Sequence, residues 1–395
     1  MISDYFQREL DLLRERGKSF SRRHPALAPM LSDEGTDPDV ERLLEGTAYL
    51  SANIREKLDD QLPEIIHSLL NMVAPHYLRP VPSSTIISFT PRRALRECLT
   101  IRRGTLINSV EVDGTSCPFA TCSDVEVAPL ELSKVDLRPG RAGTGRLVLE
   151  FSTLNSLPLQ AATGKSLRLY FTGAYADAAR RLMLLCHHCR GLRLVPESAR
   201  GAEAFTLPAS SLHLAAFNEG EDIIPYPAGS FCGFRYLQEF FMMPERFCLV
   251  EILNFDRWTT RGMGRSFTLE VELGDLPDEL PSFRTDHIRL FAAPAVNIFP
   301  MSGNPIRLDH RRDQYIIRPA GYDMQHYLVY SVDRVTGLRQ GESTPREYQP
   351  FLAANPGSAP NPVYSLSTRL DEGSGLVVQL AVGRVAGQEP APEVL

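Results

Sequence analysis

Four consecutive residues, Cys186-His187-His188-Cys189, have the types and spacing closest to those of a metal or redox site. A structural zinc site needs four ligands, usually in two well-spaced pairs, and the sequence has no second Cys-x-x-Cys pair. A redox pair is favoured at a helix N-terminus, whereas this pair lies at the C-terminal end of a predicted helix, where the dipole opposes ionisation. We therefore interpret one cysteine as a core residue and the histidines as a polar helix end. A thiol- or zinc-dependent protein centred on Cys186–Cys189 is the alternative.

Three other groups resemble catalytic motifs without meeting their requirements. Gly164-Lys165-Ser166 matches the end of a phosphate-binding loop, but Leu159 occupies the position of the first glycine and a predicted strand follows. Asp286-His287 and Asp309-His310 each place a carboxylate beside an imidazole, yet adjacent strand residues point to opposite faces. We therefore expect no catalytic, cofactor-binding or metal-binding residue, and a protein that is not an enzyme.

Composition and charge narrow the class of protein further. The 395 residues are 43% hydrophobic and 23% charged, an ordinary globular balance, and this length predicts two or three domains. A net charge of −6 and short, dispersed arginine doublets argue against nucleic-acid binding. Seven cysteines without a regular framework are typical of reduced thiols in a cytoplasm. No stretch approaches the ~18 apolar residues of a membrane span, so we expect a soluble, cytoplasmic protein without direct membrane insertion.

The elements that would position any functional surface begin with helices over residues 1–75. A first helix is predicted from apolar residues that recur at three- and four-residue steps or their sums, namely Phe6, Leu10, Leu13 and Phe20. Asp37-Pro38 supplies an N-cap and a first-turn proline for a second helix. Pro63 is expected to end or restart that helix, and a third, shorter apolar stripe follows over residues 65–73.

The second helix carries the candidate functional surface. Its apolar stripe covers residues 40–62, roughly 35 Å at 1.5 Å per residue. Each buried Leu or Ile contributes about 1.5–3 kcal/mol relative to exposure, so the stripe needs a partner. Packing within the chain and a helix bundle shared between chains fit the periodicity equally well. The candidate bundle interface consists of Val40, Leu43, Leu44, Leu50, Ile54 and Leu58.

After Pro75 the sequence changes from helical to β-rich. Residues 75–82 contain three prolines and predict a stiff, extended connector. Short strands are expected over residues 84–89, 105–112, 146–151, 167–171, 247–253, 267–273, 306–318, 327–335 and 376–382, with helices over 176–189 and 236–242. The prediction is an α+β fold, an N-terminal helical region followed by a β-rich, multi-domain body. The expected domains are residues 1–75, a β-rich domain with one inserted helix at 76–230, and a second β-rich domain at 231–395.

Several motifs, in order along the chain, resemble one protein family. They are Ser3-Asp4-Tyr5-Phe6-Gln7-Arg8-Glu9-Leu10, residues 37–46 (DPDVERLLEG), Lys57-Leu58-Asp59-Asp60, Pro75-His76-Tyr77-Leu78-Arg79-Pro80, Leu237-Gln238-Glu239-Phe240-Phe241, Pro244-Glu245-Arg246-Phe247, Val296-Asn297-Ile298-Phe299, residues 305–311 (PIRLDHR) and residues 329–335 (VYSVDRV). Each motif is short, but together they follow one order from residue 3 to about residue 350. The sequence resembles the TssF family, also called VasA or ImpG, the baseplate subunit of type VI secretion systems.

The resemblance implies a structural, non-enzymatic role. Relatives form wedges of a cytoplasmic baseplate in which two TssF copies join one TssG, with TssK and TssE attached. The baseplate docks on the inner-membrane complex and starts assembly of the contractile tail. Helices shared by the two TssF copies and TssG are part of that wedge, so the stripe over residues 40–62 is a candidate for the shared bundle. A wedge protein of a phage-tail-like contractile device is the alternative within the same architecture.

One departure from the family concerns the C-terminal region. Members of the family usually continue well past the point at which this sequence stops, and residues 387–392 are proline-bearing rather than the start of a further domain. The resemblance therefore implies a fragment or a shortened member that lacks the family's usual C-terminal region. Any wedge contact made by that region is not expected of these residues.

Overall fold

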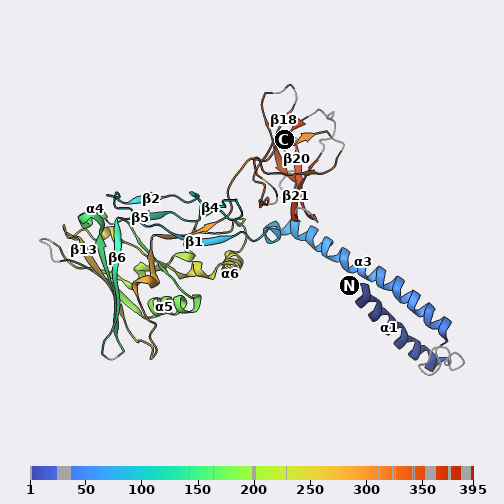
Figure 1. Cartoon of the computed structure of the whole chain (residues 1–395), viewed down its shortest axis with the longest axis horizontal. Helices are drawn as coiled ribbons and strands as arrows, with labels where there is room; N and C mark the ends of the chain where they lie inside the picture. Colours follow the sequence, from blue (N-terminus) through green and yellow to red (C-terminus); the bar gives the residue numbers. More distant parts are fainter. Residues whose placement is uncertain are drawn as a thin grey trace.

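The computed structural model describes residues 2–24, 37–141, 143–162, 164–197, 202–227, 229–309, 312–322, 324, 326–339, 341, 343–351, 362–371, 375–383 and 393–395. Figure 1 shows three parts, which we call the arm (helices α1 and α3), the body (residues 84–296) and the C-terminal part (residues 303–395). The arm projects away from the body, and the C-terminal part lies beside the root of the arm (Figure 1). Helices at the front and a β-rich remainder confirm the predicted α+β class.

The arm is a pair of helices, α1 (Ile2–Arg23) and α3 (Pro38–Val73). Asp37 caps α3 as predicted, because its side chain accepts a hydrogen bond from the backbone N–H of Asp39 at 3.0 Å and Pro38 occupies the first turn. The expectation that Pro63 ends or restarts this helix is wrong, since α3 is one element from Pro38 to Val73. The apolar period continues across Pro63, and we attribute the continuity to that period outweighing the ~3 kcal/mol cost of an interior proline.

A short segment joins the arm to the body. Its first residues form the 3-10 helix η2 (Pro75–Leu78), so the wholly extended connector expected at residues 75–82 is corrected here. The chain becomes extended only from Arg79, which has φ −72° and ψ 146°. The first proline of the connector takes the first position of a turn, where its missing N–H costs nothing. We call residues 75–79 the elbow.

The body is built from antiparallel sheets. One four-stranded sheet has the order β1 (Ser84–Ser88), β15 (Ala292–Val296), β4 (Pro118–Thr121), β3 (Leu106–Asn108). The five-stranded sheet has the order β10 (Phe205–Pro208), β9 (Cys189–Pro196), β13 (Ser266–Leu273), β7 (Gly145–Thr153), β6 (Leu130–Pro139). Another four-stranded sheet has the order β11 (Leu212–Leu214), β12 (Leu249–Ile252), β8 (Leu167–Phe171), β14 (Ile288–Leu290). β2 (Leu99–Ile101) pairs with β5 (Val125–Val127). Strands from both sides of residue 230 thus share sheets of the body.

Helices and short 3-10 turns lie between the strands of the body in the sequence. The remaining helices are α4 (Leu159–Ala162), α5 (Tyr175–His188) and α6 (Cys232–Met242), with 3-10 turns η3 (Leu154–Ser156), η4 (Ala209–Ser211), η5 (Ala215–Phe217), η6 (Pro244–Cys248), η7 (Phe255–Arg257) and η8 (Thr285–His287). The helix predicted at residues 176–189 agrees with α5 within one residue at each end. α6 starts four residues earlier than predicted, at Cys232.

The main hydrophobic core lies inside the body. It joins residues of β7, β9 and β13 to residues of β8 and β12, and α5 contributes Leu184 and Leu185. The rings of Phe151 and Phe267 stack at 4.8 Å between centroids, and Trp258, fully buried, packs edge-on against Phe267 at 5.5 Å. Aromatic side chains bury the largest apolar areas of any residues, so this cluster contributes strongly to the stability of the body.

The C-terminal part has its own sheet and core. Its strand order is β16 (Arg307–Leu308), β22 (Glu393–Val394), β18 (Val335–Arg339), β19 (Arg346–Pro350), β20 (Val363–Asp371), β21 (Gly375–Gly383), β17 (Tyr315–Ile316). Buried Val335, Tyr348, Tyr364 and Leu380 form the core. The strand expected at residues 327–335 is corrected, because residues 327–334, all of them described, form no strand and β18 begins at Val335. The strand expected at residues 306–318 is two separate pieces, β16 and β17.

The described helices include none that combines the length and the apolar character needed to cross a membrane.

Candidate interaction surfaces

The seam between α1 and α3 combines a leucine of α1, two alanines of α3 and peripheral ion pairs. Leu10 of α1 is buried, and so are Ala48 and Ala52, which lie one turn apart on the side of α3 that faces α1. At the edges of the seam, Arg55 Nη1 lies 2.7 Å from Glu9 Oε1, and Arg14 pairs with Glu41. These contacts use only one side of α3.

The predicted stripe on α3 is mostly exposed. The exposed fractions are 71% for Leu43, 64% for Leu50, 62% for Ile54 and 56% for Leu58, whereas Val40 and Leu44 are half-buried. Four large apolar side chains therefore face away from α1 along a single helix. Packing against α1 explains the alanine side of α3 and leaves these four residues uncovered by the described part of the chain. Their role as an interface stays a prediction.

The half of α3 nearest the body is exposed for a different reason. α1 is fourteen residues shorter than α3, since the two helices have 22 and 36 residues. Figure 1 shows the N-terminus beside the middle of α3, so α1 accompanies only the outer half. Ile66, Leu69 and Val73, on the inner half, are 50%, 57% and 82% exposed. The apolar surface of α3 therefore extends from its outer half to the elbow.

The elbow connects three parts of the molecule through aromatic contacts. The buried ring of His76 packs against Tyr77 at 4.5 Å and edge-on against Tyr226 of the body at 4.6 Å. The guanidinium of Arg79 lies over the ring of Tyr330 in the C-terminal part, 5.3 Å from its centroid. Burial lowers the pKa of His76, and the charge of Arg79 lowers it further. The elbow thus favours a neutral imidazole in the folded protein.

A buried ion pair fixes α6 to the body. Glu239 has no exposed surface, and its Oε1 accepts hydrogen bonds from the backbone N–H groups of Ile223 at 2.9 Å and Ile224 at 3.2 Å. Its carboxylate also pairs with Arg246, which donates to the carbonyl oxygens of Ala216 at 3.1 Å and Glu221 at 2.7 Å. Burial lowers the pKa of Arg246 to about 10. Sequence reasoning did not identify this pair, although both residues lie in motifs quoted above.

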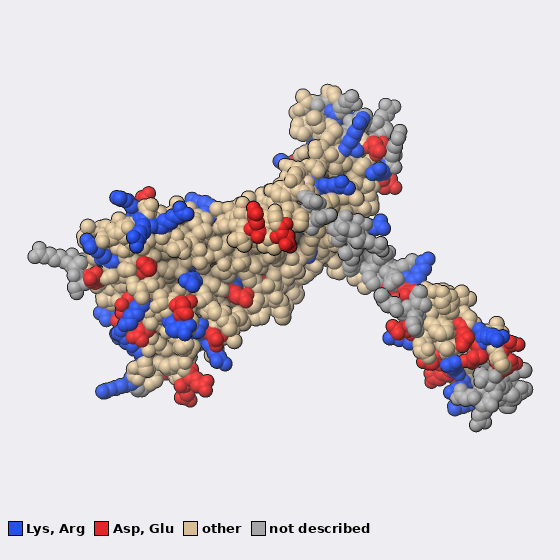
Figure 2. All heavy atoms as spheres, viewed as in Figure 1, with Lys and Arg blue, Asp and Glu red and all other residues tan. Residues whose placement is uncertain are grey.

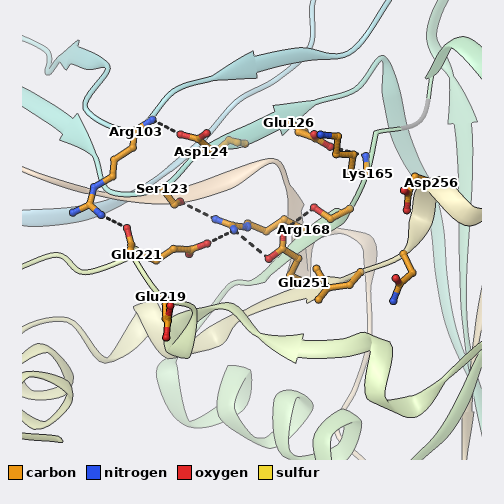
Figure 3. Close-up of a pocket in the computed structure, with 15 residues that line it drawn as sticks. Arg103, Ser123, Asp124, Glu126, Lys165, Arg168, Glu219, Glu221, Glu251 and Asp256 are labelled. Carbon is orange, nitrogen blue, oxygen red and sulfur yellow. Dashed lines mark hydrogen bonds and ion pairs between the residues drawn. The ribbon is translucent and has the colours of Figure 1, made fainter. Parts of the chain in front are cut away.

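A polar cleft of about 600 Å³ lies on the body next to this region, and Figure 3 shows its side chains. Arg168 at its centre donates to Ser123 Oγ at 2.7 Å, to Glu221 Oε1 at 2.6 Å and to Glu251 Oε2 at 3.4 Å (Figure 3). Burial raises the pKa of Glu221, against the opposing effect of Arg168. The buried charges at the centre of the cleft are thus bound to one another. We assign them a structural role, joining β8 and β12 to the loop at residues 218–222.

The cysteine pair lies where the sequence placed it. Cys186 is in the last turn of α5, Cys189 caps that helix at its C-terminal end, and Cys189 packs against the main core. His188 Nδ1 lies 3.0 Å from the carbonyl oxygen of Gly274. Partial desolvation raises the pKa of both thiols, although Cys186 is an exposed residue and Cys189 a half-buried one, and a raised pKa disfavours the thiolate needed for redox chemistry or metal binding. Among the residues that the structure describes, no three His, Cys, Asp or Glu side chains are grouped so as to hold a metal ion.

Comparisons with known proteins agree with the resemblance seen in the sequence. Residues 1–379 match the family model described as type VI secretion system, TssF. The type VI secretion system component TssF1 of Pseudomonas aeruginosa is 31% identical over 379 residues, which cover 89% of this chain and 60% of that protein. A solved chain of the TssK-TssF-TssG baseplate subcomplex of the type VI secretion system is similar in fold, with a TM-score of 0.71, 25% identity and coverage of 90% of this chain.

The chain spans less than two thirds of these relatives, because the match covers 60% of TssF1 and 66% of the solved chain. The family model nevertheless extends over the arm, the body and most of the C-terminal part. The likeness to the solved relative covers nine tenths of the chain. This chain therefore belongs to the TssF family of type VI secretion system proteins.

Proposed function

We propose that this chain is a structural wedge subunit of a type VI secretion baseplate. In this proposal it assembles with a second copy of itself and one TssG, and TssK and TssE attach to that wedge. Family membership supports the proposal, as does the likeness to a chain of a TssK-TssF-TssG baseplate subcomplex. The protein would act through its surfaces, without catalysis, in the cytoplasm at the baseplate that docks on the inner-membrane complex.

The single observation that carries this proposal is the uncovered stripe of α3. Leu43, Leu50, Ile54 and Leu58 lie on a helix that projects into solvent beyond the body (Figure 1). Burying such side chains stabilises a complex by roughly 1.5–3 kcal/mol each. Helices of a second copy and of TssG would cover the stripe and form a bundle. The charged residues of both signs that gather on the outer arm (Figure 2) would form the polar rim of that bundle.

Co-expression with the TssG and TssK encoded in the same genome tests the proposal. We expect a stable complex that contains two copies of this chain for each TssG, measured by native mass spectrometry after affinity purification. A chain that remains monomeric in the presence of both proteins would overturn the proposed function.

The role of the stripe is tested by Leu50→Arg, because a guanidinium in an apolar seam is buried without a partner. We expect at least a tenfold loss of complex at equal protein concentration. Ser19→Arg is the matched control, since it adds the same charge at an exposed position of α1 outside the stripe. Circular dichroism of both variants should match that of the wild type. Equal complex formation by Leu50→Arg and Ser19→Arg would exclude this stripe as the seam.

A further inference from the structure

The short helix α6 has its polarity reversed relative to an ordinary surface helix. Arg235 and Glu239 are the only charged residues between Cys232 and Met242, and both are directed inwards. Arg235 Nη1 lies 3.7 Å from Asp222 Oδ1, and Glu239 is held by Arg246. A surface helix normally packs its apolar side on the core and presents charge to water. In α6 the charges hold the helix in place and the outer face is left apolar.

The outward face of α6 and the residue before it form what we call the α6 patch. The exposed fractions of its four residues are 68% for Phe231, 55% for Phe234, 55% for Leu237 and 78% for Phe241. Phe231 and Phe234 pack edge-on, with ring centroids 5.7 Å apart, and the Phe231 ring covers Gly233. Large exposed apolar patches on a protein surface mark binding sites.

We propose that the α6 patch docks into an uncharged, apolar groove on another subunit of the baseplate, at a site separate from the arm. Phe234, Leu237 and Phe241 stand at positions i, i+3 and i+7 of one helix, the spacing of side chains that enter a groove on a partner. The patch carries no charge, so a charged partner surface would lose its hydration without gaining a counter-ion. The inference rests on the proposed function, because the partner belongs to the same assembly.

Two other occupants fit the patch less well. Helices that lie on membranes carry Lys or Arg beside the apolar face, whereas the one basic residue of α6 is turned inwards. On the face shown in Figure 2, the described residues at the α6 end of the body form no cluster of Lys or Arg.

A second copy facing the first through α6 would bury roughly 500 Å² on each side, because a phenylalanine contributes about 150–250 Å² when fully buried. Specific interfaces need about 800 Å² on each side. A partner whose groove surrounds the helix and whose polar rim contacts the adjoining surface would bury the remaining area.

Cys232, the first residue of α6, allows the proposal to be tested in the native chain. It is exposed, and Cys186 on α5 provides an exposed thiol outside the patch. Labelling with a small maleimide is followed by peptide mass spectrometry for the chain alone and for its complex with TssG and TssK. We expect the labelling rate of Cys232 to fall at least about tenfold in the complex, and that of Cys186 to stay within about twofold.

A pair of variants separates docking from folding. Phe241→Gln changes a side chain that the chain leaves 78% exposed, and Val110→Gln makes a comparable change at an 83% exposed position on a loop of the body. The melting temperatures of both variants should equal that of the wild type. We expect Phe241→Gln to weaken the complex about tenfold or more, as for the apolar centre of an interface, and Val110→Gln to leave it unchanged.

The outcomes distinguish this inference from the proposed function. If no complex with TssG or TssK forms, the proposed function fails together with the inference. If the complex forms while Cys232 labels at an unchanged rate and Phe241→Gln binds normally, the inference alone is overturned. Protection of Cys232 that rises with the concentration of the chain alone would show a second copy on the patch. Protection by phosphatidylglycerol vesicles would show a membrane surface instead, and either result replaces the proposed partner.

Discussion

The arm and the body bury apolar side chains to very different degrees. In the body, Trp258, Phe151 and Phe267 are enclosed among strands from two sheets. In the described part of the arm, the buried apolar residues are Leu10, Ala48 and Ala52, while larger side chains of α3 remain in contact with water. The alanines that α3 packs against α1 are small, so their burial contributes little to the stability of the helix pair. The stabilisation is proportional to the apolar area removed from water.

This contrast separates two sources of stability in one chain. The body has a core of its own and is stable through contacts that it makes internally. The described part of the arm instead leaves most of its large apolar side chains on α3 in contact with water. The difference predicts that substitutions in the body change the stability of the chain, whereas substitutions on the α3 stripe change assembly.

The largest effect is expected from Phe151→Ala in the body. Removing a fully buried ring that stacks on Phe267 leaves a cavity, so the free energy of unfolding should fall by about 3–5 kcal/mol, measured by urea denaturation. Leu58→Ala, at a 56% exposed position of the arm, is the control and should change it by less than about 0.5 kcal/mol. Similar losses for the two variants would remove the contrast between arm and body.

A smaller and local effect is expected from Ala52→Leu in the arm. Ala52 is buried in the seam, so the larger side chain should destabilise the pairing of α1 with α3 by about 1–3 kcal/mol. Hydrogen exchange should become faster in α1 and the outer half of α3 and stay unchanged in the body. Lys57→Leu is the control, since it places the same side chain at an exposed position of the same helix. Faster exchange in the body as well would mean that the two parts unfold as one unit.

The smallest effect is expected at the elbow, where His76 links stability to pH. Because burial lowers the pKa of His76 below its ordinary value of 6.5, the unfolded chain binds more protons than the folded one as the pH falls below 6.5. The stability that the neutral ring gives is therefore complete above that value and is lost at lower pH. The melting temperature of the wild type should fall more between about pH 7.5 and 5.5 than that of His76→Phe, which keeps an aromatic ring. An equal fall in melting temperature for the wild type and His76→Phe would show that the imidazole does not titrate in this range.

Local patterns in the sequence predicted much of the fold. The cap at Asp37, the extent of α5 and the position of β8 depend on neighbouring residues, and the structure confirms them. The order of strands could not be predicted, because β13 lies between β7 and β9, which both precede it by many tens of residues in the sequence. Residues 327–334 have a strand-like composition, yet a strand requires a neighbour to pair with, and composition does not supply one.

The candidate surfaces were predicted in part for similar reasons. The period of α3 revealed the stripe, and the alanines at positions 48 and 52 could have indicated where α1 packs. The α6 patch was missed because the helix was expected to begin at Tyr236, which left Phe231 and Phe234 outside it. Charged residues of a surface helix ordinarily face water, whereas Arg235 contacts Asp222 and Glu239 contacts Arg246. Only the folded chain shows that these charges point inwards.

The unbroken course of α3 across Pro63 has a mechanical consequence. Thirty-six residues at 1.5 Å each make a rod of about 54 Å, attached to the body through the few residues around His76. A rotation of about ten degrees at that attachment would carry the far tip through roughly 9 Å, nearly the spacing between two packed helices. The aromatic contacts of His76 and Arg79 would thus act as a pivot. A small rotation there would produce a large displacement of the far tip of α3.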